Sequence, residues 1–500
     1  MQEIILLNMN LKRIRRVLAA VVFLLITLLF LDFSGTMHVW FGWLAKIQFL
    51  PAVLALNLVV VAVLLLLTLA FGRIYCSVIC PLGIMQDLIS WLHGKTKKNR
   101  FSYSGEKRWL RYGVLGVFVV ALVAGAGSLV ALLAPYSSFG RIVTNLLKPI
   151  YEAGNNVLAS IAEHYESYAF YHVDVWIRSM PTFIIAAVTF VIVAVLAWRG
   201  GRTYCNTICP VGTVLSFFAR FSWLKIRFDA DKCKNCSLCT KNCKASCIDY
   251  KTHTVDYSRC VTCGNCLDKC KFGALSYSHA TPAKTESPQP IDSGRRSFLV
   301  ASAMATTAAA LAQEKKKVDG GLATIEDKVA PARKTPLTPP GSLSASNMAK
   351  RCTGCQLCVS ECPNGVLRPS TDLLKLMQPT MSYELGYCRP ECHRCSEVCP
   401  TGAIKPISLE EKTSTQIGHA VWVKKNCVVV TDGVECGNCE RHCPSGAIQM
   451  VPMDENDELS PLIPAVNEAK CIGCGACENL CPARPFSAIY VEGHEQHHQI

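Results

Sequence analysis

Apolar residues in the first 200 positions of the chain are gathered into four long runs. The runs cover residues 17–31, 52–71, 113–134 and 182–198. Each is about long enough to cross the roughly 30 Å of hydrocarbon in a bilayer as a helix. The first run follows a basic stretch, as in a signal peptide, but no small-residue cleavage site follows Leu31, so an anchor is favoured. The pattern predicts an α-helical membrane domain with four transmembrane helices.

Basic residues are divided unevenly between the loops that join these runs. Residues 1–16, 72–112 and 199–296 contain 28 Lys and Arg, whereas residues 32–51 and 135–181 contain 4. By the positive-inside rule, both ends of the four-helix unit are expected in the cytoplasm, with the helices in a bacterial inner membrane. The net charge of +14 therefore indicates orientation in a lipid bilayer, and nucleic acid is not an expected partner.

Composition narrows the class of protein further. The 500 residues include 29 cysteines, with 50% apolar and only 18% charged residues, which excludes an ordinary cytosolic enzyme. A small disulfide scaffold is excluded by the length of the chain. No histidine lies inside the four apolar runs and no C-x-x-C-H motif occurs, so haem is not expected.

The membrane half contains an internal repeat. Residues 73–83 have the sequence Arg-Ile-Tyr-Cys-Ser-Val-Ile-Cys-Pro-Leu-Gly, and residues 202–212 have Arg-Thr-Tyr-Cys-Asn-Thr-Ile-Cys-Pro-Val-Gly. The unit is therefore expected to be two hairpin repeats. Its cysteines, Cys76, Cys80, Cys205 and Cys209, are interpreted as redox thiols or ligands of an extra iron–sulfur cluster. The alternative is four buried cysteines at helix ends, where proline stops the helix.

A bacterial two-cluster ferredoxin pattern follows the second repeat. In this pattern three closely spaced cysteines hold one 4Fe–4S cluster and the fourth crosses to the other. The expected ligands are Cys233, Cys236, Cys239 and Cys270 for one cluster, and Cys260, Cys263, Cys266 and Cys243 for the other. Zinc is the disfavoured alternative, because paired C-x-x-C zinc sites do not need the third and fourth cysteines. The remaining Cys247 is interpreted as a packing residue.

Four more motifs, with sixteen cysteines, lie between residues 348 and 500. They are Cys352, Cys355, Cys358 and Cys362; Cys388, Cys392, Cys395 and Cys399; Cys427, Cys436, Cys439 and Cys443; and Cys471, Cys474, Cys477 and Cys481. The chain is thus expected to hold six 4Fe–4S clusters, or seven with the repeat cysteines. Exchange of the fourth cysteine is either nested, first motif with fourth and second with third, or sequential. The fold class is a helical membrane domain plus α+β ferredoxin-like domains.

The segment between the two ferredoxins resembles an export signal. Arg295 and Arg296 precede Ser-Phe-Leu and a weakly apolar run that ends at Ala312, which is a twin-arginine pattern. Export of a folded domain would keep its metal in place. The alternative is an alanine-rich cytoplasmic helix. The predicted domains are residues 1–230, 231–280, 281–347 (twin-arginine segment, fifth apolar helix and linker) and 348–500, with the last one periplasmic.

These motifs carry a family resemblance. Residues 10–280, with the paired Tyr-Cys-x-x-x-Cys-Pro repeats and a two-cluster ferredoxin, look like NapH-type membrane ferredoxins. Residues 290–490, with twin arginines and four motifs, resemble NapG-type periplasmic ferredoxins. The resemblance implies a quinol dehydrogenase that feeds a periplasmic reductase, often nitrate reductase. In this chain the twin-arginine segment is internal, so export of a multispanning protein has to be supposed.

The residues alone indicate the same class of protein. Many clusters and no nucleotide-binding Gly-rich fingerprint describe an electron carrier whose two-electron partner is dissolved in the membrane, and quinol is the expected donor. An outer segment with His164 and His172 is a candidate quinol site, although an interfacial aromatic belt is the favoured interpretation. A redox service protein, or a storage or assembly subunit, remains an alternative.

Overall fold

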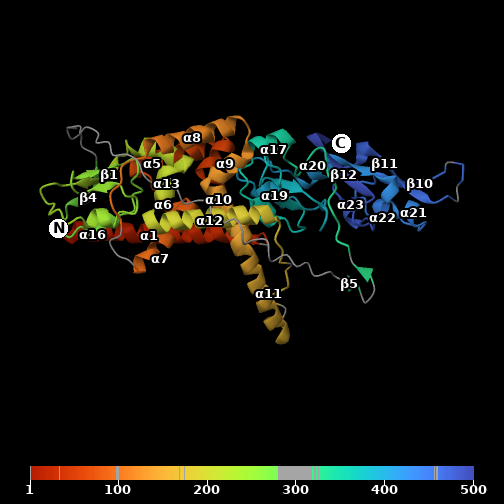
Figure 1. Cartoon of the computed structure of the whole chain (residues 1–500), viewed down its shortest axis with the longest axis horizontal. Coiled ribbons are helices and arrows are strands. Elements are labelled where there is room, and N and C mark those ends of the chain that lie inside the picture. Colours follow the sequence, from red (N-terminus) through yellow and green to blue (C-terminus); the bar gives the residue numbers. More distant parts are fainter. Residues whose placement is uncertain are drawn as a thin grey trace, which may run out of the picture.

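The computed structural model describes residues 2–32, 34–96, 101–167, 169–173, 175–279, 318–319, 323–324, 326–454, 456–457 and 460–500. The described part of the chain is elongated, with a helical body in the middle and a small ferredoxin-like unit at each end (Figure 1). The unit nearest the N-terminus comes from residues 224–279, and the unit at the far end comes from residues 326–500. The helical body therefore separates the two sets of ferredoxin motifs.

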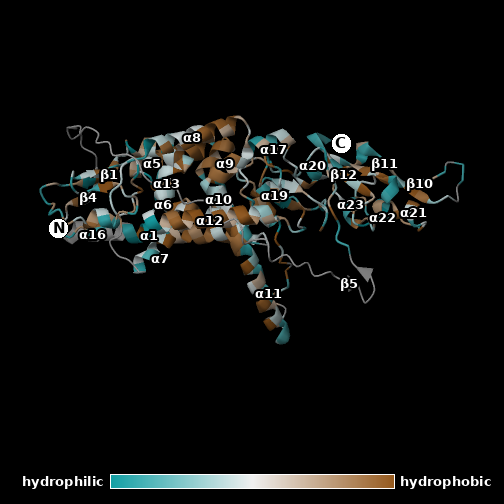
Figure 2. Ribbon diagram, viewed as in Figure 1, coloured by the Kyte–Doolittle hydropathy of each residue, from teal (hydrophilic) through white to brown (hydrophobic). Residues whose placement is uncertain are grey.

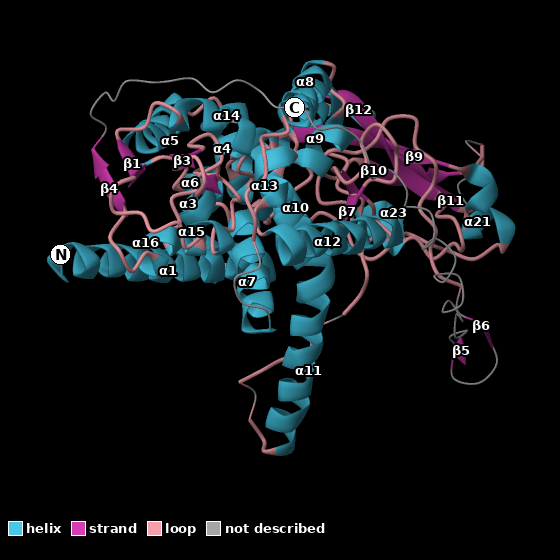
Figure 3. Ribbon diagram, turned by 60° about the vertical axis from the view of Figure 1, so that its left-hand side comes forward, coloured by secondary structure: helices cyan, strands magenta, loops and turns pink. Residues whose placement is uncertain are grey.

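The helical body is built from residues 2–219. Its described helices are α1 (Gln2–Leu31), α2 (Thr36–Phe41), α3 (Trp43–Lys46), α4 (Phe49–Leu54), α5 (Leu58–Phe71), α6 (Tyr75–Val78), α7 (Pro81–Thr96), α8 (Arg108–Val123), α9 (Gly127–Leu133), α10 (Pro135–Ile142), α11 (Lys148–His164), α12 (Met180–Gly200), α13 (Thr203–Thr207) and α14 (Pro210–Ala219). A π-helical stretch over Val143–Leu147 joins α10 to α11. Helices α1 and α12 run lengthwise through the body, whereas α11 projects away from it (Figures 1 and 3).

Two of the four apolar runs form helices long and apolar enough to cross a membrane. They are Lys12–Leu31 within α1 and Met180–Gly200, which is α12. Both expose large apolar side chains on the outside of the body, such as Leu24 and Val191. Figure 2 shows the hydrophobic colour concentrated over the helical body rather than the two ends. These two helices hint at association with a membrane.

The other two predicted spans are interrupted in the structure. The second run is divided between α4 and α5, because Leu56 is left-handed and the Asn57 side chain accepts a hydrogen bond from Val60 N at 3.2 Å, which begins a new helix. The third run is divided between α8 and α9 at Gly125, where φ is +73°. A continuous apolar run does not predict these breaks, since they depend on one capping side chain and one left-handed turn. Four transmembrane helices are therefore not shown.

The first ferredoxin unit begins earlier than its cysteines indicate. Its elements are β1 (Leu224–Phe228), α15 (Leu238–Lys241), β2 (Ile248–Asp249), β3 (Thr254–Val255), α16 (Asn265–Lys269) and β4 (Leu275–His279). Strand β1 pairs antiparallel with β4, with Leu224 opposite His279, and β2 pairs with β3. Strand β1 thus lies before the predicted boundary at residue 231, and it has no cysteine to mark it.

The C-terminal unit contains two similar lobes. Its elements are α17 (Ala345–Arg351), α18 (Leu357–Glu361), β7 (Leu367–Pro369), β8 (Pro379–Met381), α19 (Arg394–Val398), α20 (Leu409–Ser414), β9 (Thr415–Trp422), α21 (Val428–Thr431), α22 (Asn438–Arg441), β10 (Ile448–Pro452), β11 (Leu462–Val466), α23 (Ala476–Leu480) and β12 (Ile489–Gln499). The strands pair antiparallel as β7 with β8, β9 with β12 and β10 with β11. The β9–β12 ribbon lies at the side of the unit in Figure 3.

The segment before the C-terminal unit is partly folded onto it. Short strands β5 (Val318–Asp319) and β6 (Ala323–Thr324) pair with each other. From residue 326 onward the chain packs on the unit: Leu337 is fully buried and Lys328 Nζ donates to three carbonyl oxygens of residues 478–481. The linker predicted over residues 313–347 is therefore shorter. Arg295, Arg296, Ala312 and the predicted fifth apolar helix lie outside the described residues.

Candidate functional site

Groups of four cysteines recur at both ends of the structure, each around a small cavity. One cavity in the first ferredoxin unit is lined by Cys233, Cys236, Cys239 and Cys270. Two cavities in the C-terminal unit are lined by Cys362, Cys388, Cys392 and Cys395, and by Cys427, Cys436, Cys439 and Cys481. In every case three cysteines belong to one motif and the fourth belongs to a partner motif.

The remaining ferredoxin cysteines form three further groups that are close enough for strong electrostatic interaction. They are Cys266 with Cys243, Cys260 and Cys263; Cys358 with Cys352, Cys355 and Cys399; and Cys477 with Cys443, Cys471 and Cys474. Exchange of the fourth cysteine in the C-terminal unit is therefore sequential, first motif with second and third with fourth. The nested alternative does not occur in the structure, because each lobe is built from motifs that are neighbours along the chain.

A shared backbone conformation wraps each regular motif around its cavity. In four motifs the residues just before and just after the second cysteine are left-handed, with φ between 50° and 78°. These residues are 235 and 237, 262 and 264, 354 and 356, and 473 and 475. Left-handed backbone turns the chain sharply, so the three cysteines face one point. The two motifs with altered spacing lack this pair, since φ is −127° at His393 and −131° at Gly437.

The donor set fits 4Fe–4S clusters rather than single metal ions. In the part of the chain that the structure describes, no three His, Cys, Asp or Glu side chains are placed to hold one metal ion. A 4Fe–4S cluster takes four thiolates spread around a larger cube. Four cysteines around one cavity, three of them from a closely spaced motif, match that arrangement. Zinc would require the four sulfurs to meet around one ion.

The internal repeat brings its four cysteines together in the middle of the helical body. Cys76, Cys80, Cys205 and Cys209 are each 4% exposed, and the other three act electrostatically on Cys209. Burial raises the pKa of the Cys80 thiol, so this thiol stays neutral unless a metal binds it. Pro81 and Pro210 begin α7 and α14, which is the position where a helix tolerates proline. The prolines therefore start helices as well as ending the preceding ones.

Two arginines join the repeats by crossing from each copy to the other. Arg73 Nη2 donates to the Cys205 carbonyl oxygen at 3.1 Å, and Arg202 Nη1 donates to the Cys76 carbonyl oxygen at 2.6 Å. Each guanidinium also lies near the thiol of its own repeat, 3.8 Å from Cys76 Sγ and 3.9 Å from Cys205 Sγ respectively. The reciprocal contacts indicate a pseudo-twofold relation between the two copies.

The glycine that ends each repeat motif leaves room for this crossing. A Cβ on Gly83 would lie 2.4 Å from the Cys76 carbonyl oxygen and 2.6 Å from Arg202 Nη1. A Cβ on Gly212 would lie 2.4 Å from the Cys205 carbonyl oxygen and 2.7 Å from an Arg73 nitrogen. Only glycine permits such close approach, so the Cys-Pro-x-Gly motif and the arginine eight residues before Pro81 or Pro210 form one structural unit.

Two buried arginines near these cysteines are not paired with a carboxylate among the described residues. Arg73 donates to Asn206 Oδ1 and to carbonyl oxygens, and Arg141 donates to two carbonyl oxygens and a serine hydroxyl. Both are 0% exposed. Arg141 donates to the Gly354 carbonyl oxygen, next to Cys355, and its burial lowers its pKa to about 10. Burying a charge without a partner costs folding free energy. An anionic, thiolate-bound centre beside these two cations would therefore stabilise them.

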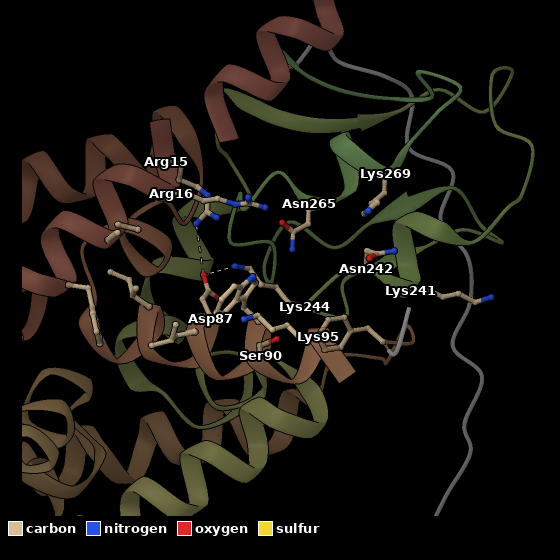
Figure 4. Close-up of a pocket in the computed structure, with 18 of the residues that line it drawn as sticks. Arg15, Arg16, Asp87, Ser90, Lys95, Lys241, Asn242, Lys244, Asn265 and Lys269 are labelled. Carbon is tan, nitrogen blue, oxygen red and sulfur yellow. Dashed lines mark hydrogen bonds and ion pairs between the residues drawn. The ribbon is translucent and has the colours of Figure 1, made fainter. Parts of the chain in front are cut away.

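Asp87 on α7 is the centre of an ion network between the repeat and the first ferredoxin unit. Arg202 donates to its carboxylate at 2.7 and 2.8 Å, and Lys244 donates to the same group. Burial alone would raise the pKa of Asp87, but these two cations hold it well below its usual range. The carboxylate faces a cavity of about 670 Å³ between α1, α7 and the first ferredoxin unit (Figure 4). The network connects the repeat cysteines with Lys244, the neighbour of Cys243.

The histidines of the predicted outer segment lie apart from the cysteine groups. His164 ends the projecting helix α11, and the exposed His172 lies 3.7 Å from Glu163. A different histidine is close to a cysteine group: His38 on α2 is 3.2 Å from Glu361, the residue before Cys362. Both side chains are buried and line a cavity of about 640 Å³. No periodicity or motif in the sequence marks this pair, because its members are 323 positions apart.

Sequence reasoning also missed the structural role of Arg73 and Arg202. The signal was present, since both copies of the repeat begin with arginine three residues before the first cysteine. The leftover Cys247 is 1% exposed, and its Sγ lies 3.5 Å from Cys243 Sγ. It packs beside a ligand, as the sequence predicts.

Comparisons with known proteins place the same segments in iron–sulfur families. A family model described as a 4Fe–4S binding domain matches residues 53–99 and 180–229, which contain the two Cys-Pro repeats. Two models described as 4Fe–4S dicluster domains match residues 351–403 and 434–484, and residues 256–366. The matches therefore include the two Cys-Pro repeats and most of the ferredoxin motifs, but not residues 230–255 or 404–433.

Individual relatives match parts of the chain. The methylamine utilization ferredoxin-type protein MauM of Methylobacillus flagellatus is 34% identical over 32% of this chain and 70% of its own length. The putative electron transport protein YccM of Escherichia coli is 26% identical over 39% of this chain and 47% of its own length. The ferredoxin-type protein NapF of Escherichia coli is 26% identical over 32% of this chain and 87% of its own length. No solved structure matches the chain. The chain belongs to the ferredoxin-type iron–sulfur electron-transfer proteins that include MauM.

Proposed function

We propose that the protein oxidises quinol in the bacterial inner membrane and passes the electrons through six or seven 4Fe–4S clusters to a periplasmic reductase, such as nitrate reductase, or to that reductase's electron-carrying subunit. In this proposal it combines the parts of NapH-type and NapG-type ferredoxins in one chain and crosses the membrane four times. The observation that carries the proposal is the placement of cysteine groups at both ends and in the middle of one elongated molecule.

The cysteine groups are near neighbours along this line. In the C-terminal unit the Cys388 amide donates to the Cys474 carbonyl oxygen at 3.0 Å, which joins the two lobes. Arg141 lies beside both Cys355 and Tyr204, the residue before Cys205. On the other side Lys244 acts on Cys263 and pairs with Asp87, which pairs with Arg202. Bound clusters would supply one-electron steps, and the chain places the cysteine groups that would hold them near one another.

His38 supports a location for the quinol headgroup close to this line. Its Nε2 lies 3.0 Å from the Leu29 carbonyl oxygen, which only accepts hydrogen bonds, so Nε2 carries the proton. The other ring nitrogen, Nδ1, has no hydrogen-bond partner among the described residues. It is therefore the unprotonated nitrogen of the ring and the atom that would accept a hydroxyl proton. The cavity also has Trp43 in its wall, and Val39 and Trp40 nearby are exposed, as suits entry from a membrane interface.

The repeat cysteines provide the first test. Replacing any one of Cys76, Cys80, Cys205 and Cys209 with serine should abolish reduction by a quinol analogue of the clusters in the first ferredoxin unit, which lies beyond the repeat from His38. Dithionite should still reduce these clusters, because a hydroxyl does not replace a thiolate ligand or redox thiol in the repeat. Bleaching of the cluster absorbance measures both reactions. Cys247→Ser is the matched control, since Cys247 is equally buried and should behave like wild type. Normal bleaching in all four variants would leave the repeats as structural helix ends.

Iron content tests the number of clusters independently of the donor. Six clusters require about 24 irons per chain, and a seventh at the repeat raises this to about 28. Iron analysis of anaerobically purified protein, with low-temperature EPR, distinguishes the two. A value near 8 would mean that only the first ferredoxin unit, with its two motifs, holds clusters.

A second candidate function is redox service to another enzyme. The similarity to a methylamine utilization protein favours it, since that protein's name refers to a pathway rather than to a reductase. In this case a quinol analogue would fail to reduce the wild-type clusters, whereas a low-potential electron carrier would reduce them. The same bleaching experiment therefore separates the two functions.

A further inference from the structure

The cavity beside Asp87 is surrounded by positive charge. Helix α1, helix α7 and the first ferredoxin unit enclose about 670 Å³, and Figure 4 shows the polar side chains around it. The cations that line it are Arg15, Arg16, Lys95, Lys241, Lys244 and Lys269, and the carboxylate that lines it is Asp87. The polar part of this cavity is therefore strongly cationic.

This charge is not compensated by the protein around the cavity. Asp87 is already paired with Arg202, which does not line the cavity, and with Lys244. Its carboxylate is also 3.9 Å from Arg15. In the described part of the chain Arg16, Lys241 and Lys269 have no ion pair. Cations gathered from three elements without acidic partners repel one another, so the assembly is stabilised by an anion that binds between them.

The opposite wall of the cavity is apolar and continues to the outside of the helical body. On α1 the lining passes from Arg15 and Arg16 through two alanines to Phe23 and Leu24, and α7 contributes Ile84, Leu88 and Trp91. Leu24, Leu88 and Trp91 are about half exposed, at 58%, 46% and 57%. Lys95 Nζ lies 4.2 Å from the centre of the Trp91 ring. Such a sequence of cations, aromatic ring and aliphatic wall is typical of the headgroup boundary of a bilayer.

We infer that this cavity binds the headgroup of an anionic phospholipid, with the phosphate among the cations and an acyl chain along α1 and α7. A free phosphate would neutralise the cations but leave the apolar wall exposed. A neutral quinol would cover the apolar wall but leave the positive charge uncompensated. The lipid contacts Lys241 and Lys269 on the ferredoxin unit as well as Arg16 on α1, so it fastens that unit to the helical body. This inference does not depend on the proposed quinol chemistry.

The test measures lipid retained by the whole protein. Purified full-length protein, stripped of lipid in a neutral detergent, is titrated with phosphatidylglycerol or phosphatidylcholine and examined by native mass spectrometry. Wild type should retain one phosphatidylglycerol in preference to phosphatidylcholine. The triple variant Arg16→Gln/Lys241→Gln/Lys269→Gln should bind it about a hundredfold more weakly, since each cation near an anionic lipid contributes about tenfold or less.

A second triple variant provides the matched control. Arg13→Gln/Lys251→Gln/Lys271→Gln removes the same charge from α1 and the ferredoxin unit, but none of these residues lines the cavity, so its binding should equal that of wild type. Equal loss in both variants, equal retention of both lipids by wild type, or full protection of the protein against heat by inorganic phosphate alone would each overturn the inference. Absorbance of the iron–sulfur centres confirms that both variants are folded.

Discussion

At the scale of single residues, the repeat motif is defined by contacts that exchange between its two copies. Arg73 and Arg202 each bind the backbone of the opposite repeat, and Gly83 and Gly212 leave room for them. The duplicated cysteine spacing indicated that four thiols could meet if the two copies are related by a pseudo-twofold axis. It was not sufficient to predict the exchange, because a repeat in the sequence does not say which copy an arginine will contact.

Gly212→Ala should disrupt the repeat site selectively. The added Cβ would lie 2.4 Å from the Cys205 carbonyl oxygen, and such overpacking costs about 1–3 kcal/mol of unfolding free energy. We expect quinol-dependent bleaching of the clusters in the first ferredoxin unit to be lost, while dithionite still reduces them. Gly113→Ala is the control, since its Cβ meets no atom within 4 Å. Wild-type quinol kinetics in Gly212→Ala would show that this close packing is not required.

Replacing His38 and His172 in turn should distinguish the two candidate quinol locations. His38→Gln removes the ring nitrogen that would accept the hydroxyl proton, so we expect quinol-dependent cluster reduction to slow by about tenfold or more. His172→Gln, at an exposed position near Glu163, should leave the rate within about twofold of wild type. The rates come from stopped-flow bleaching at saturating quinol analogue. The reverse result would place the quinol in the outer segment with His164 and His172.

At the scale of elements, the sequence predicted which kinds of element occur better than it predicted where each one begins and ends. The apolar runs predicted helices, but the breaks at Leu56 and Gly125 depend on local backbone conformation that hydropathy does not record. The cysteine motifs predicted the ferredoxin units, whereas β1 and the chain from residue 326 have no cysteines and were placed outside them. Sequential exchange of ligands was one of two open alternatives, since spacing is the same in both.

The β9–β12 ribbon carries a titratable group that makes stability depend on pH. Burial, together with neighbouring His494 and His498, lowers the pKa of His497 to about 4, and its Nε2 lies 3.0 Å from Thr338 Oγ1. In the unfolded chain histidine titrates near 6.5, so the unfolded state binds more protons between about pH 6.5 and 4. The stability that neutral His497 contributes is therefore complete above about pH 6.5 and is lost as the pH falls toward 4.

His497→Gln should reduce this dependence on pH. Between pH 7 and pH 5 the thermal midpoint of the wild-type C-terminal unit should fall more than that of the variant. The unfolding free energy that wild type loses through His497 over the whole window, from about pH 6.5 to 4, is up to about 3 kcal/mol. Differential scanning calorimetry of the whole protein at constant ionic strength measures it. His442→Gln, at an exposed position, should follow wild type. Parallel pH curves for wild type and His497→Gln would contradict the assignment.

At the scale of the whole molecule, α1 runs from one ferredoxin unit to the other. Lys12 near its start pairs with Asp268 of the first unit, and His38 just beyond its end contacts Glu361 of the C-terminal unit. The two units lie at opposite ends of the helical body (Figure 1). If α1 crosses a membrane, the units face opposite compartments. The orientation predicted from loop charge stays a prediction, and the cationic cavity beside Arg15 and Arg16 lies at the end that it assigns to the cytoplasm.

The twin-arginine pattern predicts how the C-terminal unit would be exported across the membrane, and this prediction can be tested. Arg295→Lys/Arg296→Lys should prevent export of the C-terminal unit, because the folded-protein export route requires the arginine pair. In spheroplasts, added protease should cleave wild type beyond residue 313 and leave the first ferredoxin unit protected. In the variant both units should be protected, while Arg199→Lys, a similar change outside the pattern, should not alter the cleavage. Protection of the C-terminal unit in wild type would contradict the orientation, because the two ends of the helical body would then face the same compartment and α1 would not span the bilayer.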